Sequence, residues 1–238
     1  MNRIVTMVMK NILIVPGAWT KLCRYAKHPE NYPEQERYAH IQYILQRAVK
    51  GGNVELLVTG KENIPAEGGF LMYANHQGMF DVVAIGATCD RPLGAVLKKE
   101  LQDLPLIKQV IACTRSFAMD REDVRQSLTV IQKVIHEVQS GRSYLIFPEG
   151  TRSKNSNQMG PFHHGSFRAA TKTHCPVVPV ALVDSYKVLD QKGSKPVLVQ
   201  LHYLEPISYE AYKDMNTKEL SALVKARIEE KIRACEEH

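Results

Sequence analysis

One histidine and one aspartate stand five residues apart at a spacing that suits acid–base chemistry. His76 follows the apolar run Phe70–Tyr73, and Asp81 precedes the apolar run Val82–Ile85, so a strand-to-helix connection separates them. On a continuous helix the pair would lie about 140° apart, but Gly78 permits a turn between them. Asp81 can then cap the following helix. Alternatively, it can hold one ring nitrogen of His76 and leave the other free as a base.

A second cluster of functional residue types, from Phe147 to Ser153, lies at the end of the apolar run Tyr144–Phe147. In α/β domains, ligand-binding groups gather at the carboxyl ends of strands. Glu149 can accept a hydrogen bond from a hydroxyl, Gly150 allows a ligand close to the backbone, and Arg152 has the planar fork that suits a phosphate. An ordinary turn with a solvated arginine is the alternative, but the density of functional types favours a site.

Two weaker signals follow the same pattern. Asp120 and Arg121 come after the short apolar step Phe117–Met119. Arg121 can bind an anion or belong to a charge pair at the start of a helix. The run Cys175–Ala181, with prolines at its entry and within it, is typical of a buried strand.

From residue 53 onward, apolar runs of strand length alternate with segments of helical periodicity. The candidate strands are Val54–Val58, Phe70–Tyr73, Leu93–Leu97, Tyr144–Phe147, Val177–Leu182 and Val197–Leu201. The candidate helices are Asp81–Thr88, Asp103–Ile111, Arg121–Gln139, Gly165–Thr173 and Lys218–Cys235. This alternation predicts an α/β domain at 53–238, with a central sheet, mostly parallel or mixed, flanked by helices.

Residues 1–52 are predicted to form a basic, amphipathic element of two helices. The first helix covers Ile4–Trp19, and Lys10 interrupts its apolar run. The run is shorter than a membrane-spanning helix, which needs about 20 apolar residues. We expect this helix to break at Pro16 and to lie in a membrane interface, with Trp19 and Tyr25 as anchors. Packing on the protein's own core is the alternative.

The second helix of this element is predicted from Glu34 to Lys50, where apolar residues recur at helical spacing. Residues 1–50 carry eight basic and three acidic side chains, and so hold +5 of the chain's net charge of +6. Such an excess suits an anionic membrane or a nucleic acid, although a solvated basic face has the same composition. The sequence contains no recognisable nucleic-acid-binding motif.

The composition of the 238 residues, 44 % hydrophobic and 24 % charged, is that of an ordinary globular protein with a substantial core. The five cysteines are scattered, odd in number and without a CxxC pair, which indicates reduced thiols in a cytosolic setting. The adjacent His163 and His164 have no cysteine or carboxylate at a known ligand spacing, so we expect no metal site.

In this order, the signals resemble the motifs of the glycerophospholipid acyltransferase family. That family's N-H-x4-D motif is matched by Asn75, His76 and Asp81, and its F-P-E-G-T-R-S motif by Phe147–Ser153. Further matches are the Asp120-Arg121 end of the second motif, the apolar Val177–Val180 of the fourth, and the basic step Leu97–Leu101. The resemblance covers about 54–205, and small bacterial 1-acyl-glycerol-3-phosphate acyltransferases look most similar. It implies the glycerol-3-phosphate acyltransferase-like fold.

The chain departs from the family pattern at two places. The second motif often has Gly at the position of Arg115 or Ser116, and a bulky apolar residue where Ala118 stands. Phe162–Gly165 replaces the usual Phe-Lys-x-Gly with Phe-His-His-Gly. Both departures concern the acceptor rather than the chemistry.

The resemblance implies an enzyme that moves a fatty acyl group from a thioester to the sn-2 hydroxyl of 1-acyl-glycerol 3-phosphate (lysophosphatidic acid), giving phosphatidic acid. His76 would be the general base and Asp81 its partner. The implied substrate-binding residues include cations for the phosphate and groups around the glycerol: Lys98, Arg121, Glu149, Gly150, Thr151 and Arg152.

The resemblance implies acyl-CoA or acyl carrier protein as co-substrate, with no cofactor and no metal. With the basic arm, it implies an anionic membrane surface as partner, no nucleic acid, and a peripheral or monotopic location at the cytoplasmic face of the cell membrane. The alternatives are an acyltransferase that uses glycerol 3-phosphate or another lysophospholipid, and a non-catalytic lipid-binding protein.

Overall fold

The structure is a computed structural model that describes residues 3–153, 155–191, 193 and 195–237. Within this part of the chain, a seven-stranded sheet forms the centre, in the order β1-β7-β6-β2-β5-β3-β4. The strands are β1 (Val54–Thr59), β2 (Leu71–Ala74), β3 (Leu93–Lys98), β4 (Phe117–Met119), β5 (Ser143–Ile146), β6 (Val177–Val183) and β7 (Val197–Tyr203). The predicted α/β class is confirmed.

The sheet is mixed. Strands β2 to β6 pair in parallel, whereas β7 runs antiparallel to β6 and β1 runs parallel to β7. The carboxyl ends of the five parallel strands therefore share one edge of the sheet. Because the candidate residues follow β2, β4 and β5, the topology brings their loops to this common edge.

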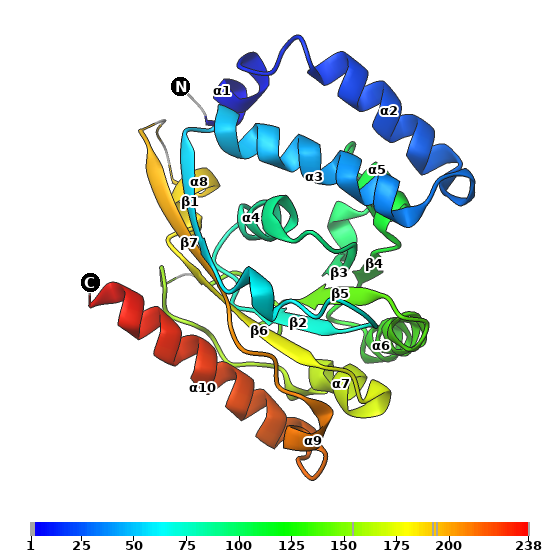
Figure 1. The fold of residues 1–238 in the computed structure, drawn as a ribbon, viewed down its shortest axis with the longest axis vertical. Helices are drawn as coiled ribbons and strands as arrows, with labels where there is room; N and C mark the ends of the chain where they lie inside the picture. Colours follow the sequence, from blue (N-terminus) through cyan, green and yellow to red (C-terminus); the bar gives the residue numbers. More distant parts are fainter. Residues whose placement is uncertain (1–2, 154, 192, 194, 238) are drawn as a thin grey trace.

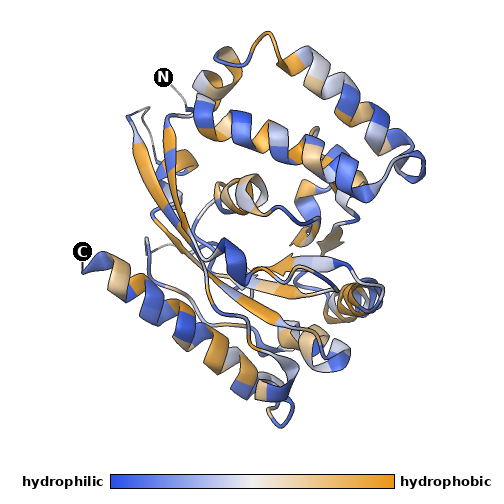
Figure 2. Ribbon diagram, viewed as in Figure 1, coloured by the Kyte–Doolittle hydropathy of each residue, from blue (hydrophilic) through white to orange (hydrophobic). Residues whose placement is uncertain are grey.

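Helices cover both faces of the sheet (Figure 1). They are α1 (Arg3–Met9), α2 (Val15–Lys27), α3 (Glu34–Gly51), α4 (Asp81–Thr88), α5 (Ile107–Thr114), α6 (Val124–Gln139), α7 (Arg168–Thr173), α8 (Tyr186–Leu189), α9 (Tyr209–Tyr212) and α10 (Thr217–Glu236). Helices α6, α7 and α10 lie on one face, and α4 lies on the other beneath α3, with α2 outermost. Figure 2 shows hydrophobic residues along the strands and mixed hydropathy along α3 and α10, as half-buried helices require.

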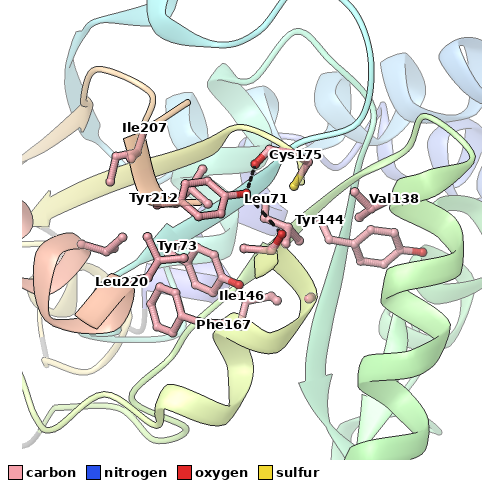
Figure 3. Close-up of a cluster of buried hydrophobic side chains, with 14 of the residues drawn as sticks. Leu71, Tyr73, Val138, Tyr144, Ile146, Phe167, Cys175, Ile207, Tyr212 and Leu220 are labelled. Atoms are coloured by element: carbon pink, nitrogen blue, oxygen red, sulfur yellow. Dashed lines mark hydrogen bonds between the residues drawn. The ribbon is translucent and has the colours of Figure 1, made fainter. Parts of the chain in front are cut away.

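Strand β2, which leads into the His76 loop, lies in the middle of the core. Leu71 and Tyr73 face the cluster beneath α6, α7 and α10, whereas Met72 and Ala74 face the cluster beneath α4. The Tyr73 ring stacks on Phe167 with 4.1 Å between centroids (Figure 3). Burial on both faces explains the unbroken apolar run, and it gives the following loop a rigid base.

Helix α6 shows why one predicted boundary moved. The helix was expected to begin at Arg121 but begins at Val124. The Asp123 side chain accepts hydrogen bonds from the backbone N–H groups of Arg125 and Gln126, which is the geometry of an N-cap. Arg121 therefore lies in the loop that precedes the helix and is not part of its first turn.

The prediction of one helix at Ile4–Trp19 is wrong, because the structure has two separate helices there, α1 and α2. The chain breaks between α1 and α2, before Pro16, which lies within the first turn of α2. Proline is tolerated there because no N–H is needed at that position. Tyr25 is also not an exposed anchor: it is 1 % exposed and donates its hydroxyl to Glu36 on α3. Among the described residues, no helix has both the length and the apolarity to cross a membrane.

The buried histidine on β7, His202, has a lowered pKa. His202 is 3 % exposed, with Nδ1 2.8 Å from Thr59 Oγ1 and Nε2 3.2 Å from Cys235 Sγ. Burial, assisted by the charge of Lys231, lowers the pKa of His202 from 6.5 to about 4. The folded protein therefore keeps this imidazole neutral at pH values where the unfolded chain protonates it.

This shift should appear in the pH dependence of stability. As the pH falls below about 6.5, His202 becomes protonated in the unfolded chain. In the folded chain it stays neutral until the pH reaches about 4. We expect the free energy of unfolding to drop by up to about 3 kcal/mol from this residue across that window. Urea titrations of the native protein and of His202→Gln, which cannot take the proton, would measure it. Equal losses in both proteins would contradict the expectation.

Candidate active site

The loop between β2 and α4 brings His76 and Asp81 into direct contact. His76 Nδ1 lies 2.7 Å from Asp81 Oδ2. The backbone N–H groups of Gln77 and Gly78 donate to the same oxygen at 2.6 and 3.0 Å. Asp81 is the first residue of α4, yet its carboxylate turns back to the loop and does not cap the helix. Of the two geometries open to Asp81, the structure has the one that orients His76.

The carboxylate of Asp81 is fully buried and well supplied with donors. Its second oxygen, Oδ1, accepts the hydroxyl of Ser185, which follows β6. Hydrogen bonds to both oxygens offset the cost of burying the group. Because Nδ1 of His76 must carry the hydrogen in its bond to Asp81, Nε2 is left as the acceptor. The His76 side chain is 16 % exposed, so a ligand can reach it.

The loop after β5 fixes the backbone of His76 from both sides. Glu149 accepts the N–H of His76 at 2.7 Å through one oxygen and the N–H of Gly160 at 2.8 Å through the other. The N–H of Ser153 donates to the His76 carbonyl at 2.7 Å. The His76 ring also stacks on Phe147 with 4.2 Å between centroids. The two motifs therefore form one hydrogen-bonded unit.

Glu149 is 3 % exposed, and this burial raises the pKa of its carboxyl group above the ordinary value, although the two N–H bonds oppose the shift. Each carboxylate oxygen of Glu149 already accepts a backbone N–H, so in this structure Glu149 holds the His76 loop in place. Contact of Glu149 with the glycerol of an acceptor stays a prediction.

Gly150 lies at the meeting point of two predicted motifs. Its φ of +67° is in the left-handed region, where a side chain would be strained. A Cβ there would also approach His163 Cδ2 to 3.1 Å. Arg121 Nη1 donates to the Gly150 carbonyl. The contact places the arginine after β4 beside the loop after β5, as the shared edge of the sheet requires.

Arg152 and Thr151 line a polar cavity of about 430 Å³ next to the His76 loop. The lining residues are Gln77, Thr151, Arg152, Ser153, Ser156, Tyr186, Asp190 and Gln191. Arg152 Nη1 lies 2.6 Å from Asp190 Oδ1, and the arginine side chain is 49 % exposed. The cavity therefore combines an accessible guanidinium with hydroxyl and amide groups, which suits a polar, anionic ligand.

Lys98 is placed differently from the other predicted residues. It ends β3 and pairs locally with Glu100, with 2.8 Å between Nζ and Oε1. The neighbouring Lys99 pairs with Asp120 at 3.3 Å. Anion binding by Lys98 stays a prediction, since the contact that the structure gives it is this exposed ion pair.

Three residues that support the site were not predicted. Ser185 binds Asp81, Asp190 binds Arg152, and Gln77 joins two loops by donating to Asn157 Oδ1 at 2.8 Å and accepting the Ser185 N–H at 3.0 Å. Ser185 lies two residues after the buried strand β6, so the rule that located Glu149 could also have found it. Asp190 carries no such signal in the sequence.

The arrangement has the parts of a general-base site. A histidine with a fixed tautomer and an accepting Nε2 lies in a loop that borders the polar cavity of Arg152, and Arg121 contacts the loop after β5 that holds this histidine. Such a site can deprotonate a hydroxyl and hold an anionic group near it. In the described residues, no set of three or more histidine, cysteine, aspartate or glutamate side chains is arranged to hold a metal.

Comparisons with known proteins agree with this geometry. A family model described as Acyltransferase matches residues 55–183, which include the His76–Asp81 and Phe147–Ser153 motifs. The chain therefore belongs to this acyltransferase family, and the resemblance in its motifs is confirmed.

Two relatives and one solved structure illustrate the likeness. The probable 1-acyl-sn-glycerol-3-phosphate acyltransferase of Mycoplasma pneumoniae is 30 % identical over 188 residues, 76 % of this chain and 69 % of that protein. The 1-acyl-sn-glycerol-3-phosphate acyltransferase of Escherichia coli is 30 % identical over 166 residues, 69 % of this chain and 67 % of that protein. The crystal structure of the 1-acyl-sn-glycerophosphate (LPA) acyltransferase from Thermotoga maritima superposes with a TM-score of 0.80 and 21 % identity, covering 99 % and 97 % of the two chains. This last likeness shows the fold.

Proposed function

We propose that this acyltransferase moves a fatty acyl group from an acyl thioester to the sn-2 hydroxyl of 1-acyl-glycerol 3-phosphate and so makes phosphatidic acid for phospholipid biosynthesis. The names of the relatives from Mycoplasma pneumoniae and Escherichia coli support this acceptor. The single observation that carries the chemistry is the 2.7 Å contact between His76 Nδ1 and Asp81 Oδ2, which leaves Nε2 to accept a proton.

In the proposed reaction, His76 Nε2 takes the proton of the acceptor hydroxyl as that oxygen attacks the thioester carbonyl. The new C–O bond replaces the C–S bond, and the proton passes from the imidazolium to the leaving thiolate. Asp81 stabilises the imidazolium while it exists. General-base help of this kind is worth about 10²–10⁴-fold.

Positioning contributes more than the base in this proposal. Holding hydroxyl and thioester in attack geometry can supply up to about 7–11 kcal/mol. Arg121 and Arg152 would bind the acceptor's phosphate, and Gly150 and Thr151 would lie beside its glycerol. Asp190 engages one of the five N–H donors that a guanidinium offers, so Arg152 can bind Asp190 and a phosphate together.

The test is thiol release by the purified chain in mixed micelles. Acyl-CoA and acyl carrier protein would be offered as donors, each with lysophosphatidic acid, glycerol 3-phosphate or lysophosphatidylcholine as acceptor. We expect release that depends on lysophosphatidic acid with at least one donor. Release with only another acceptor would overturn the acceptor assignment. Tight lipid binding by a folded protein that releases thiol with neither donor would favour the non-catalytic reading.

We also propose that residues 1–52 dock the catalytic domain, 53–238, on the anionic cytoplasmic face of the cell membrane. Apolar side chains are unusually exposed around the turn between α1 and α2: Leu13 is 93 % exposed, Met9 61 % and Ile12 52 %. Beside them, an apolar cavity of about 260 Å³ opens between α1, α2 and α3. Exposed apolar surface with a net positive charge is what an interfacial element needs.

Docking can be tested by sedimentation with vesicles that contain phosphatidylglycerol. We expect the double variant Ile12→Ser, Leu13→Ser to lower the partition constant for the vesicles at least about 30-fold, because each lost apolar side chain removes insertion energy of about 1–3 kcal/mol. Leu198→Ser is the matched control, since Leu198 is 48 % exposed on β7. Unchanged binding of the double variant, or an equal loss in the control, would refute this role of the turn.

A further inference from the structure

We propose that Asp190 is a positioning residue that presets the Arg152 guanidinium for the acceptor's phosphate and fastens it to the loop that carries His76. The inference rests on the proposed function, because it assigns to Arg152 the phosphate of the lysophosphatidic acid. Asp190 lies outside the part of the chain, 55–183, that the family model matches.

The carboxylate of Asp190 joins two loops that come from different strands. Its Oδ1 lies 2.6 Å from Arg152 Nη1, in the loop after β5. Its Oδ2 accepts the backbone N–H of Met79, in the loop after β2, at 3.1 Å. One side chain therefore ties the predicted phosphate group to the loop between His76 and Asp81.

The short helix α8 is held tightly against that loop. A Cβ on Gly78 would clash with Asp190 Oδ2 and would come within 3.1 Å of Tyr186 Cα. A side chain at position 78 would therefore displace the Asp190 carboxylate or push α8 slightly away from the loop. At the other end of the same segment, Ser185 binds the Asp81 carboxylate. Segment 185–190 thus contacts the His76–Asp81 loop at both of its ends.

The contact should act on binding more than on stability. The Arg152 and Asp190 side chains are 49 % and 29 % exposed, and ion pairs of such exposure add little to folding. A long arginine side chain that is already held in place, however, loses less conformational freedom when a phosphate binds. Asp190 engages Nη1 only, so the rest of the planar fork remains for the ligand.

The experiment measures acyl transfer to lysophosphatidic acid by the full chain carrying Asp190→Ala, Arg152→Ala or both. We expect Asp190→Ala to raise the acceptor KM about 3- to 10-fold, to lower kcat by a smaller factor, and to leave the melting temperature nearly unchanged. Asp190→Asn, which keeps an oxygen for one of the two partners, should raise KM less. In the Arg152→Ala background, Asp190→Ala should add little, because its partner is gone.

The matched control is Glu210→Ala, which breaks an exposed ion pair with Lys213 at 2.8 Å on α9. Its acceptor KM should equal that of the native protein. An unchanged KM in Asp190→Ala, or effects of the two substitutions that simply multiply, would overturn the inference while leaving the proposed function intact. A native chain that ignores lysophosphatidic acid would overturn both, and this is seen before any variant is compared.

Discussion

Replacing His76 with asparagine should lower kcat about 10²–10⁴-fold, the contribution of a positioned general base. Asparagine can still donate a hydrogen bond to Asp81, but it has no basic nitrogen to take the hydroxyl proton. The acceptor KM should change little, because the binding groups are elsewhere in the site. Steady-state thiol release at saturating donor, over a range of lysophosphatidic acid concentrations, separates the two constants.

His174→Asn provides a control for the loss of a stacked imidazole. The His174 ring stacks on Tyr209 at 4.1 Å and 24°, much as the His76 ring stacks on Phe147 at 4.2 Å and 25°. His174 is exposed and the His76 side chain is only 16 % exposed, so the control matches the ring stacking, and urea unfolding of both variants measures the difference in packing. A His76→Asn protein that stays folded and keeps more than about a tenth of the native kcat would be incompatible with general-base catalysis by this residue.

Asp81→Asn should also lower kcat by about 10²–10⁴-fold. The amide oxygen can still accept the N–H groups of Gln77 and Gly78, and the amide nitrogen can turn to the hydroxyl of Ser185, which also accepts hydrogen bonds. The loop should therefore survive, with a loss of about 1–3 kcal/mol in the free energy of unfolding from weaker, uncharged hydrogen bonds. The negative charge that stabilises the imidazolium would be absent.

The measurement pairs kcat with urea unfolding for Asp81→Asn and for Asp90→Asn. Asp90 is an exposed aspartate that pairs with Lys61 at 2.6 Å, and its side chain is 70 % exposed. We expect native kcat from the Asp90 variant. Comparable kcat values in the two variants would mean that the buried carboxylate only supports the fold.

Much of the fold follows from local pattern, and the exceptions have physical reasons. Buried parallel strands such as β2 are unbroken apolar runs, so their positions were predictable. Strand β4 has three residues and α8 has four, which is too short for any periodicity to appear. Pro16 was misinterpreted as a helix breaker, because proline, which breaks a helix interior, is tolerated in the first turn of a helix such as α2.

In the site, too, the contacts between residues close in sequence were predictable and the long-range contacts were not. His76 and Asp81 meet because a short loop joins two consecutive elements, β2 and α4, which sequence spacing can reveal; Gly78 in that loop does not have a positive φ. Ser185 and Asp190 contact partners that are 104 and 38 positions away in the chain. Those contacts depend on the order of strands in the sheet, which places β6 beside β2, and on the approach of α8 to Gly78. Hydropathy and spacing contain neither fact.

The most direct test of the central claim is to measure phosphatidic acid and free thiol together. The native chain and His76→Asn would each receive an acyl thioester with an isotope-labelled acyl group, with and without lysophosphatidic acid, and products would be quantified by mass spectrometry. We expect the native chain to form labelled phosphatidic acid and thiol in equal amounts, only when the acceptor is present, and the variant to form neither at a comparable rate. Thiol released without acceptor, together with a labelled acyl group on the protein, or labelled phosphatidic acid at the native rate from the variant, would contradict direct transfer with His76 as the base.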